Sequence, residues 1–142
     1  MGATSARGAA GERSCAREVV IHLDTSFLIR AVVAGSLEDK RLRRWLRTGE
    51  TVRIASLVWA EFLCGPVSSN VAEDVAELFG EPVPFEGMDA TVAAQLYNLA
   101  GRRRGSMIDC MIAAVALRDE ARLATGNAAD FRRFAPTGLR LA

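Results

Sequence analysis

The stretch Val19-Val20-Ile21-His22-Leu23-Asp24 decides the fold. Its first five residues are mostly β-branched and apolar, which predicts a buried strand, and Asp24 ends that strand. Three further strands are expected over 52–55, 122–125 and 139–141, and helical patterns separate them. Strands that alternate with helices predict an α/β fold, in which a parallel sheet carries helices on both faces.

The helical segments are recognised by apolar residues at helical spacing and by the residues that begin and end them. Ser56 is expected to be the N-cap of one of them. The segment Pro82-Val83-Pro84-Phe85 is expected to be an edge strand or a connector, because two prolines cannot donate to a strand ladder. The helices are expected over 25–33, 37–46, 57–64, 71–79, 89–103, 106–120 and 127–134.

The length of 142 residues suits one domain. Residues 1–18 are rich in Gly, Ala, Ser and Arg and are expected to be a disordered or non-native extension, so that the domain covers 19–142. The net charge of +1 means that any basic surface for nucleic acid must be local. No stretch reaches the roughly 18 apolar residues of a membrane helix, so no membrane segment is expected.

The three cysteines lie far apart, which argues against a disulfide framework and a zinc site and fits a reducing cytoplasm. Cys64 and Cys110 stand in apolar runs and are expected to be buried. His22, the single histidine, lies inside the first strand and is expected to be a core residue whose polar groups are satisfied, rather than a general base.

Four acidic residues stand at positions where a charge needs an explanation: Asp24, Glu61, Asp109 and Asp130. Each has a structural explanation of its own. Asp24 suits a helix N-cap, and Glu61 suits a solvated helix face. The pairs Ser106/Asp109 and Asn127/Asp130 both have the spacing of a capping box.

Taken together, these residues also have a common explanation. Asp24 and the turn at Asn127 and Asp130 follow strands, and the carboxyl ends of neighbouring parallel strands meet at one edge, where ligands bind. The helix that carries Asp109 leads into the strand over 122–125 and begins near the same edge. Carboxylates gathered there repel each other unless a cation neutralises them. Oxygen ligands without a useful His or Cys favour Mg²⁺ or Mn²⁺, which hydrolyse phosphodiesters.

These residues resemble the PIN domain, most closely the VapC toxins of toxin–antitoxin pairs. The resemblance rests on four motifs in order, across nearly the whole folded region. They are Leu23-Asp24-Thr25-Ser26, Glu61, Asp109 before Ile112-Ala113-Ala114, and Thr125-x-Asn127-x-x-Asp130-Phe131. It implies a single PIN-like domain with a sheet of about five parallel strands, and a Mg²⁺- or Mn²⁺-dependent endoribonuclease. It also implies a homodimer and a cognate antitoxin that blocks the site.

By matched position, the resemblance implies that Asp24 and Asp109 are the main metal ligands. Glu61 would be a ligand or would position the attacking water, and Thr125 would orient groups through its hydroxyl. The fourth acidic position falls on Asn127 or Asp130, because many relatives carry Asp where this chain has Asn127. The N-terminal eighteen residues have no counterpart in the family pattern.

Arg102, Arg103 and Arg104 precede the helix that carries Asp109. They are expected either to contact RNA phosphates, transfer RNA being one possible substrate, or to form a solvated loop. Two other functions remain open. One is a PIN-like module that binds protein or RNA without cleavage, which the neutral Asn127 favours. The other is a phospho-acceptor receiver domain, which the absence of a late lysine disfavours, since Lys40 is the single lysine.

Overall fold

A sheet of four parallel strands forms the centre of the computed structural model, which describes residues 18–102 and 107–142. The strand order is β2-β1-β3-β4, so β1 lies between β2 and β3. The run of β-branched and apolar residues therefore forms an inner strand, as predicted. The strands are β1 (Val20–Leu23), β2 (Thr51–Ile54), β3 (Arg122–Ala124) and β4 (Arg140–Leu141).

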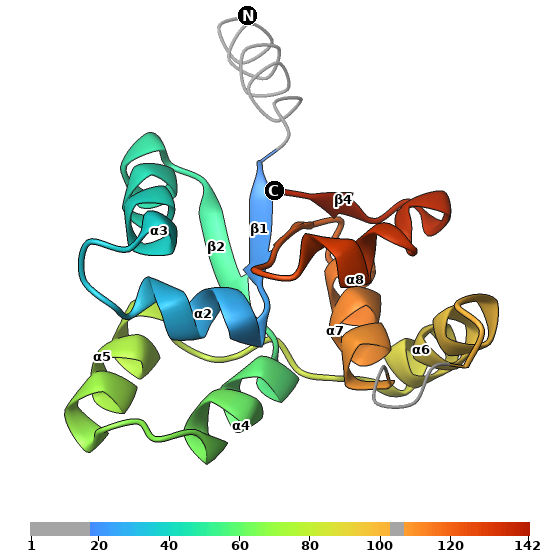
Figure 1. Ribbon diagram of the computed structural model, residues 1–142, viewed down its shortest axis with the longest axis horizontal. Coiled ribbons are helices and arrows are strands. Elements are labelled where there is room, and N and C mark those ends of the chain that lie inside the picture. The colour runs from blue at the N-terminus through green and yellow to red at the C-terminus, as the bar shows by residue number, and fades with distance from the viewer. Residues whose placement is uncertain (1–17, 103–106) are drawn as a thin grey trace, which may run out of the picture.

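Seven α-helices of the described residues surround this sheet. Figure 1 shows α2 to α5 gathered on the side of β2 and α6 to α8 on the side of β3 and β4. None of the described helices is long and apolar enough to cross a membrane. The helices are α2 (Thr25–Ala31), α3 (Leu37–Thr48), α4 (Ser56–Cys64), α5 (Ser69–Phe79), α6 (Gly87–Leu99), α7 (Met107–Arg118) and α8 (Ala128–Arg132), and a 3₁₀ turn, η1, covers Ala135–Thr137.

The segment 82–85, expected to be an edge strand or a connector, is a connector that makes a single bridge. Val83 pairs with Ala55 in parallel, donating to the carbonyl of Ile54 at 2.9 Å and accepting from the amide of Ser56 at 2.8 Å. The flanking prolines have no N–H to extend this pairing. The sheet among the described residues therefore has four strands where about five were expected.

Two helices begin at other residues than the sequence predicted. Ala55 is the N-cap of α4, whereas Ser56 is its first residue and accepts from the amide of Phe85 at 3.2 Å. The prediction of Ser56 as an N-cap is therefore wrong. Helix α6 begins at Gly87 because Glu86 and Asp89 form a capping box. It ends at Leu99, before Gly101 and Arg102 adopt positive φ.

A network of ion pairs joins the connector, α6 and the end of α7. The Arg118 guanidinium lies 2.9 Å from Asp89, 2.6 Å from the carbonyl oxygen of Pro84 and 3.4 Å from Glu86. This arginine is thus surrounded by acceptors, and it fixes α7 against α6.

A second polar pair ties α7 to the sheet. The Nε2 atom of His22 lies 2.7 Å from the Oδ2 atom of Asp119, and Arg53 adds a contact of 3.5 Å to the same oxygen. Burial lowers the pKa of His22, although Asp119 acts in the opposite direction. His22 is buried, as expected, but its Nδ1 atom finds no partner among the described residues.

Cys110 is buried in α7, as predicted. The same prediction for Cys64 is wrong, since it ends α4 with its side chain exposed. Cys15 and the expected extension over 1–18, apart from Glu18, lie outside the described residues.

Candidate active site

The register of the sheet places three segments at one edge. Leu23 pairs with Ile54 on one side and with Ala124 on the other. The residues that follow these strands, Asp24 and Thr125 among them, therefore meet at the carboxyl end of the sheet. The amide of Asp24 donates to the carbonyl of Ala124 at 2.9 Å, which continues the pairing of β1 with β3.

Asp24 is a buried carboxylate, 3% exposed, that performs a structural task with one oxygen. Its Oδ1 atom accepts from the amide of Phe27 and from the hydroxyl of Ser26, both at 2.8 Å. The N-cap explanation of Asp24 is therefore confirmed. Its Oδ2 atom accepts from the hydroxyl of Thr125 and keeps a lone pair for a further ligand. The N-cap explanation and a ligand role are therefore compatible.

Thr125 links Asp24 to the turn that follows β3. Its hydroxyl donates to Asp24 and accepts from the amide of Asn127 at 2.9 Å. The direction of the Thr125 hydroxyl proton is thereby fixed toward the carboxylate.

Two hydroxyl residues that were quoted in the motif without a role also belong to the site. Ser26 accepts from the amide of Gly126 at 3.0 Å while it donates to Asp24. Thr25 donates to Oε1 of Glu61 at 2.5 Å. A Cβ atom on Gly126 would lie 3.0 Å from Nη1 of Arg30 and 3.2 Å from the Ser26 hydroxyl, so glycine permits this close approach.

Glu61 is partly buried on α4, and its carboxylate is held by the Thr25 hydroxyl. This contact joins α4 to the first turn of α2, beside Asp24. Glu61 is therefore directed toward the carboxyl end of β1 rather than only toward solvent.

Asp109 lies in the first turn of α7, with its side chain 29% exposed. Burial raises the pKa of this carboxyl, and the charges of Asp130, Asp24 and Glu61 raise it further, while Arg133 lowers it. The other three acidic residues singled out in the sequence therefore all act on Asp109, and we call these four residues the acidic cluster. The capping explanation of Asp109 depends on Ser106, which lies outside the described residues.

Asp130 and Asn127, the two candidates for the fourth acidic position, differ in their surroundings. Asp130 acts on the pKa of Asp109, whereas Asn127 is exposed. Asn127 is the N-cap residue of α8 but makes no side-chain cap hydrogen bond, so the capping explanation fails for this pair.

Arg133 is a member of the site that sequence reasoning missed. It follows α8, its side chain is 17% exposed, and its Nη2 atom lies 3.9 Å from Oδ2 of Asp109. Its guanidinium lies over the ring of Phe134, 4.7 Å from the centroid. In the sequence it is one of two adjacent arginines, and nothing there separates it from the exposed Arg132.

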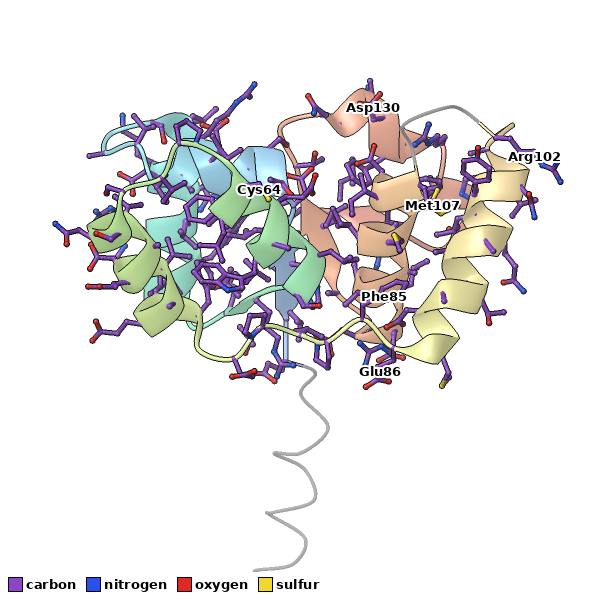
Figure 2. The ribbon with its side chains drawn as sticks, turned by 90° about the horizontal axis from the view of Figure 1, so that it is seen from below. Cys64, Phe85, Glu86, Arg102, Met107 and Asp130 are labelled. Atoms are coloured by element: carbon purple, nitrogen blue, oxygen red, sulfur yellow. The ribbon has the colours of Figure 1, made fainter. Side chains whose placement is uncertain are left out.

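The expected arginine group is described only in part. Arg102 is exposed, lies beyond the end of α6 and donates to Oδ1 of Asn98 in that helix at 3.0 Å. Figure 2 shows it at the outer end of α6, pointing away from the α8 segment that carries Asp130. Arg103 and Arg104 lie outside the described residues. The side-chain hydrogen bond of Arg102 is thus made to the neighbouring helix α6.

The cluster offers oxygen ligands, which fit a hard divalent cation such as Mg²⁺ or Mn²⁺. Within 18–102 and 107–142, no three His, Cys, Asp or Glu side chains form a ready-made group that could hold a metal ion. Mg²⁺ commonly binds through one or two carboxylates and keeps several waters, so the donor set suits it without a closed cage. The free lone pair of Asp24 and the repulsion at Asp109 are the features that fit a cation.

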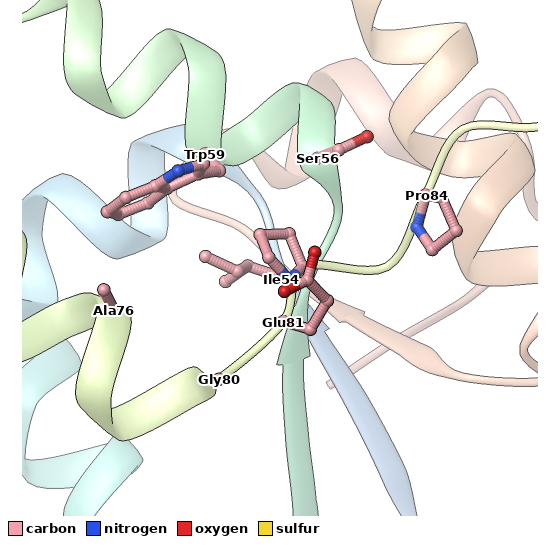
Figure 3. A pocket seen from close by; sticks show the side chains of 8 residues that line it. Ile54, Ser56, Trp59, Ala76, Gly80, Glu81 and Pro84 are labelled. Atoms are coloured by element: carbon pink, nitrogen blue, oxygen red, sulfur yellow. The ribbon is translucent and has the colours of Figure 1, made fainter.

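A separate hollow of about 670 Å³ lies beside β2. Figure 3 shows Trp59 on one side of it and Pro84 on the other, with Glu81 between them. Its lining is mostly apolar and includes one carboxylate, so it provides no set of oxygen ligands. The acidic cluster is therefore the stronger candidate for chemistry.

The sequence pattern that defines the PIN domain matches residues 21–135. The chain belongs to the PIN domain family. Its match includes all four acidic residues of the cluster, from Asp24 to Asp130. No curated protein matches the sequence significantly.

Solved structures share the fold of this PIN domain at low sequence identity. A chain of VapBC2 from Rickettsia felis, bound to a promoter DNA fragment, is 21% identical with a TM-score of 0.69, covering 87% of this chain and 98% of its own. A chain of VapBC-1 from nontypeable Haemophilus influenzae is 20% identical with a TM-score of 0.66, over 87% and 97%. VapC20 from Mycobacterium tuberculosis, a sarcin–ricin loop cleaving toxin, is 18% identical with a TM-score of 0.58, over 82% and 94%.

Proposed function

We propose that this PIN domain is a metal-dependent endoribonuclease toxin of the VapC type, which hydrolyses RNA phosphodiester bonds. One arrangement carries the proposal: Thr125 holds Asp24 and Thr25 holds Glu61 at the carboxyl end of the sheet, where the charges of Asp24, Glu61 and Asp130 raise the pKa of Asp109. Clustered carboxylates without a cation repel each other, so the arrangement is best explained by a bound divalent ion.

In this proposal Asp24 and Asp109 are the main ligands of Mg²⁺ or Mn²⁺. Asp24 would bind through Oδ2, the oxygen that its N-cap hydrogen bonds leave available. Glu61, held by Thr25, would bind the ion or position the attacking water. When bound there, a divalent ion activates water and stabilises the charge on the phosphate and the leaving oxygen.

Asp130 takes the fourth acidic position in this proposal, and Thr125 keeps the Asp24 carboxylate in one orientation. In this assignment Asp130 supplies the fourth negative charge, and Asn127 contributes only its backbone amide, which donates to Thr125. The protein's contribution is to hold these oxygens in a fixed, partly buried arrangement before the substrate arrives.

RNA is the proposed substrate class because VapC20, which has the same fold, is described as a sarcin–ricin loop cleaving toxin. Phosphate contact remains a proposal for Arg102, Arg103 and Arg104. The side chain of Arg102, the one member of this group that the structure describes, donates to Asn98 and lends this proposal no support. Transfer RNA and ribosomal RNA are both candidate targets.

A cognate antitoxin is the proposed protein partner, and a homodimer is the proposed assembly. The support is that similar folds occur in VapBC complexes and in a toxin–antitoxin complex from Klebsiella pneumoniae. We expect the product of a neighbouring small gene to co-purify with this chain and to suppress its RNA cleavage. Cleavage that continues in a stable one-to-one complex would contradict the inhibitory role.

The experiment that tests the activity is cleavage of total RNA by the purified protein with Mg²⁺ or Mn²⁺. We expect discrete fragments that disappear with EDTA and with Asp24→Asn, in which Asn preserves the helix cap. Asp74→Asn, which changes an exposed residue of α5, is the matched control and should cleave like the wild type. A folded wild-type protein that is free of partners and leaves the RNA intact would favour the alternative, a module that binds without cleavage.

A further inference from the structure

Arg133 has hydrogen-bonding capacity that the described structure leaves unused. Its Nε and Nη2 atoms are buried and find no hydrogen-bond partner among the described residues. The distance of 3.9 Å from Nη2 to Asp109 permits attraction between the charges but is too long for a hydrogen bond. A buried donor without an acceptor is unfavourable, so Arg133 is in a state that an anionic acceptor would improve.

The two unused atoms form one recognition unit. Nε and Nη2 present parallel N–H bonds along one edge of the guanidinium plane, a geometry that matches two oxygens of a carboxylate or a phosphate. Among the described residues, the ion-pair and ring contacts of this guanidinium are the 3.9 Å approach to Asp109 and the ring of Phe134, and both are weak. The long side chain can therefore turn toward a better acceptor.

Asp109 cannot serve both Arg133 and a divalent ion equally well. Two cations that share one carboxylate repel each other at short range. A cation bound at Asp109 thus weakens the one ion pair that Arg133 makes. The RNA substrate supplies the acceptor that is then needed, because each of its phosphates offers two non-bridging oxygens.

We propose that Arg133 is a phosphate-binding residue of this site, whose Nε and Nη2 groups bind an RNA phosphate, and that in the RNA-free protein it neutralises Asp109. The inference rests on the proposed function, which brings RNA and a divalent ion to the cluster. The side chain of Arg133 thus has two successive partners, Asp109 and then an RNA phosphate. Loss of its charge should therefore raise the affinity for the metal ion and lower the affinity for RNA.

The first measurement is Mn²⁺ binding by calorimetry without RNA. We expect Arg133→Gln to bind Mn²⁺ about threefold to tenfold more tightly than the wild type, because a competing positive charge is removed. Arg132→Gln is the matched control, since it removes the same charge from the adjacent, exposed residue. It should change the Mn²⁺ affinity by less than about twofold, as solvent screens an exposed charge.

The second measurement is the affinity for a fluorescent, mixed-sequence, single-stranded RNA at several salt concentrations. Ca²⁺ replaces Mg²⁺, since it takes oxygen ligands too, and a denaturing gel checks that the RNA is intact. We expect Arg133→Gln to weaken binding about tenfold and to reduce the slope of log affinity against log salt by about 0.7. Arg133→Lys keeps the charge but not the paired donors, so it should keep the slope and lose about threefold in affinity.

Opposite signs for Mn²⁺ and RNA in Arg133→Gln would support the proposal. A residue with a purely structural role would weaken both, and that outcome would overturn it. An unchanged RNA affinity, or an equal loss in Arg132→Gln, would also overturn it. If Arg133→Gln changes the two affinities in opposite directions but the wild type never cleaves RNA, the proposed hydrolysis is refuted and the role of Arg133 is not.

Discussion

Arg118 and Arg133 are two arginines at helix ends, and they differ in how many hydrogen-bond acceptors surround them. Arg133 lies near the acidic cluster, and Arg118 lies at the other end of α7. Arg118 is more exposed, at 28%, yet it is held by Asp89, Glu86 and the Pro84 carbonyl. Arg133 is less exposed, at 17%, yet Nε and Nη2 lack partners among the described residues. The ion pairs of Arg118 hold helices together, whereas two N–H groups of Arg133 are available to bind an acceptor.

The aspartates show the same contrast. Asp89 and Asp119 each lie within 3 Å of a basic group, Arg118 at 2.9 Å and His22 at 2.7 Å. Asp109 lies among three other acids, and the distance to its one basic neighbour is 3.9 Å. We therefore interpret paired charges as structural and crowded, unpaired charges as functional. Substitutions at one end of the sheet should then change activity, and substitutions at the other end should change stability.

The largest expected effect is on activity and comes from Asp109→Asn. We expect RNA cleavage to fall roughly a thousandfold, because a main ligand of the divalent ion is lost. Without metal, the variant should be at least as stable as the wild type, because the substitution removes a partly buried negative charge that three neighbouring carboxylates repel. Cleavage assays and urea denaturation in EDTA measure the two effects.

Asp119→Ala is the counterpart of that variant at the other end. It should keep the cleavage rate but lose about 2 kcal/mol of unfolding free energy, because buried His22 loses its acceptor. A loss of activity in Asp119→Ala without a loss of stability would refute the division between the two ends.

Next in size is the effect of Asp89→Ala on stability alone. Asp89 is 1% exposed, pairs with Arg118 and accepts from the amide of Glu86 at 2.9 Å. We expect about 3 kcal/mol less unfolding free energy, because a buried pair is broken and a capping box is lost. Urea denaturation checks this, with the exposed Glu73→Ala as control. Equal stability of the two variants would mean that the Arg118 network does not hold α6.

A smaller effect is expected from pH. Burial lowers the pKa of His22 below the unfolded value of 6.5, so below about pH 6.5 the unfolded chain binds a proton that the folded chain resists. Stability should therefore fall as the pH falls from about 7 to 5, by at most about 1.4 kcal/mol per pH unit from this group.

The comparison with His22→Gln isolates that contribution. Asp109 acts in the opposite direction, since its raised pKa favours the folded state as the pH falls, and this contribution is common to both proteins. The wild type should lose more stability than His22→Gln between pH 7 and 5, as thermal unfolding would show. Parallel curves would mean that His22 does not titrate differently in the folded state.

The smallest effect is expected from Arg53→Gln. Arg53 is 47% exposed and lies 3.5 Å from Asp119, so its pair is loose and solvated. We expect a loss of about 0.5 kcal/mol or less in unfolding free energy. A loss as large as that from Asp119→Ala would show that Arg53, rather than His22, is the important partner of Asp119.

The sequence predicted what depends on local patterns. The apolar run before Asp24 gave the inner strand, and strand alternation with helices placed Asp24 and Thr125 at one edge. The gathering of Asp109, Glu61 and Asp130 also followed, because four motifs occur in family order. These features follow from residue type, from spacing and from the order of the family motifs.

The sequence did not predict what depends on side-chain neighbours. Ser56 has the side chain of an N-cap, yet its hydroxyl accepts from Phe85 in a distant connector. Cys64 stands in an apolar run but is exposed in the last turn of α4. Arg133 and Arg132 are identical in type and adjacent, and only the fold buries one of them against Asp109.

The pairing of β1 with β3 also has a consequence for synthesis of the protein. Ile21 pairs with Arg122, and the amide of Asp24 bonds to Ala124, so the site joins segments that a ribosome makes about a hundred residues apart. A nascent chain carries Asp24 and Glu61 long before Asp109 and Asp130 exist. The acidic cluster can therefore assemble only after the chain has been synthesised through Asp130.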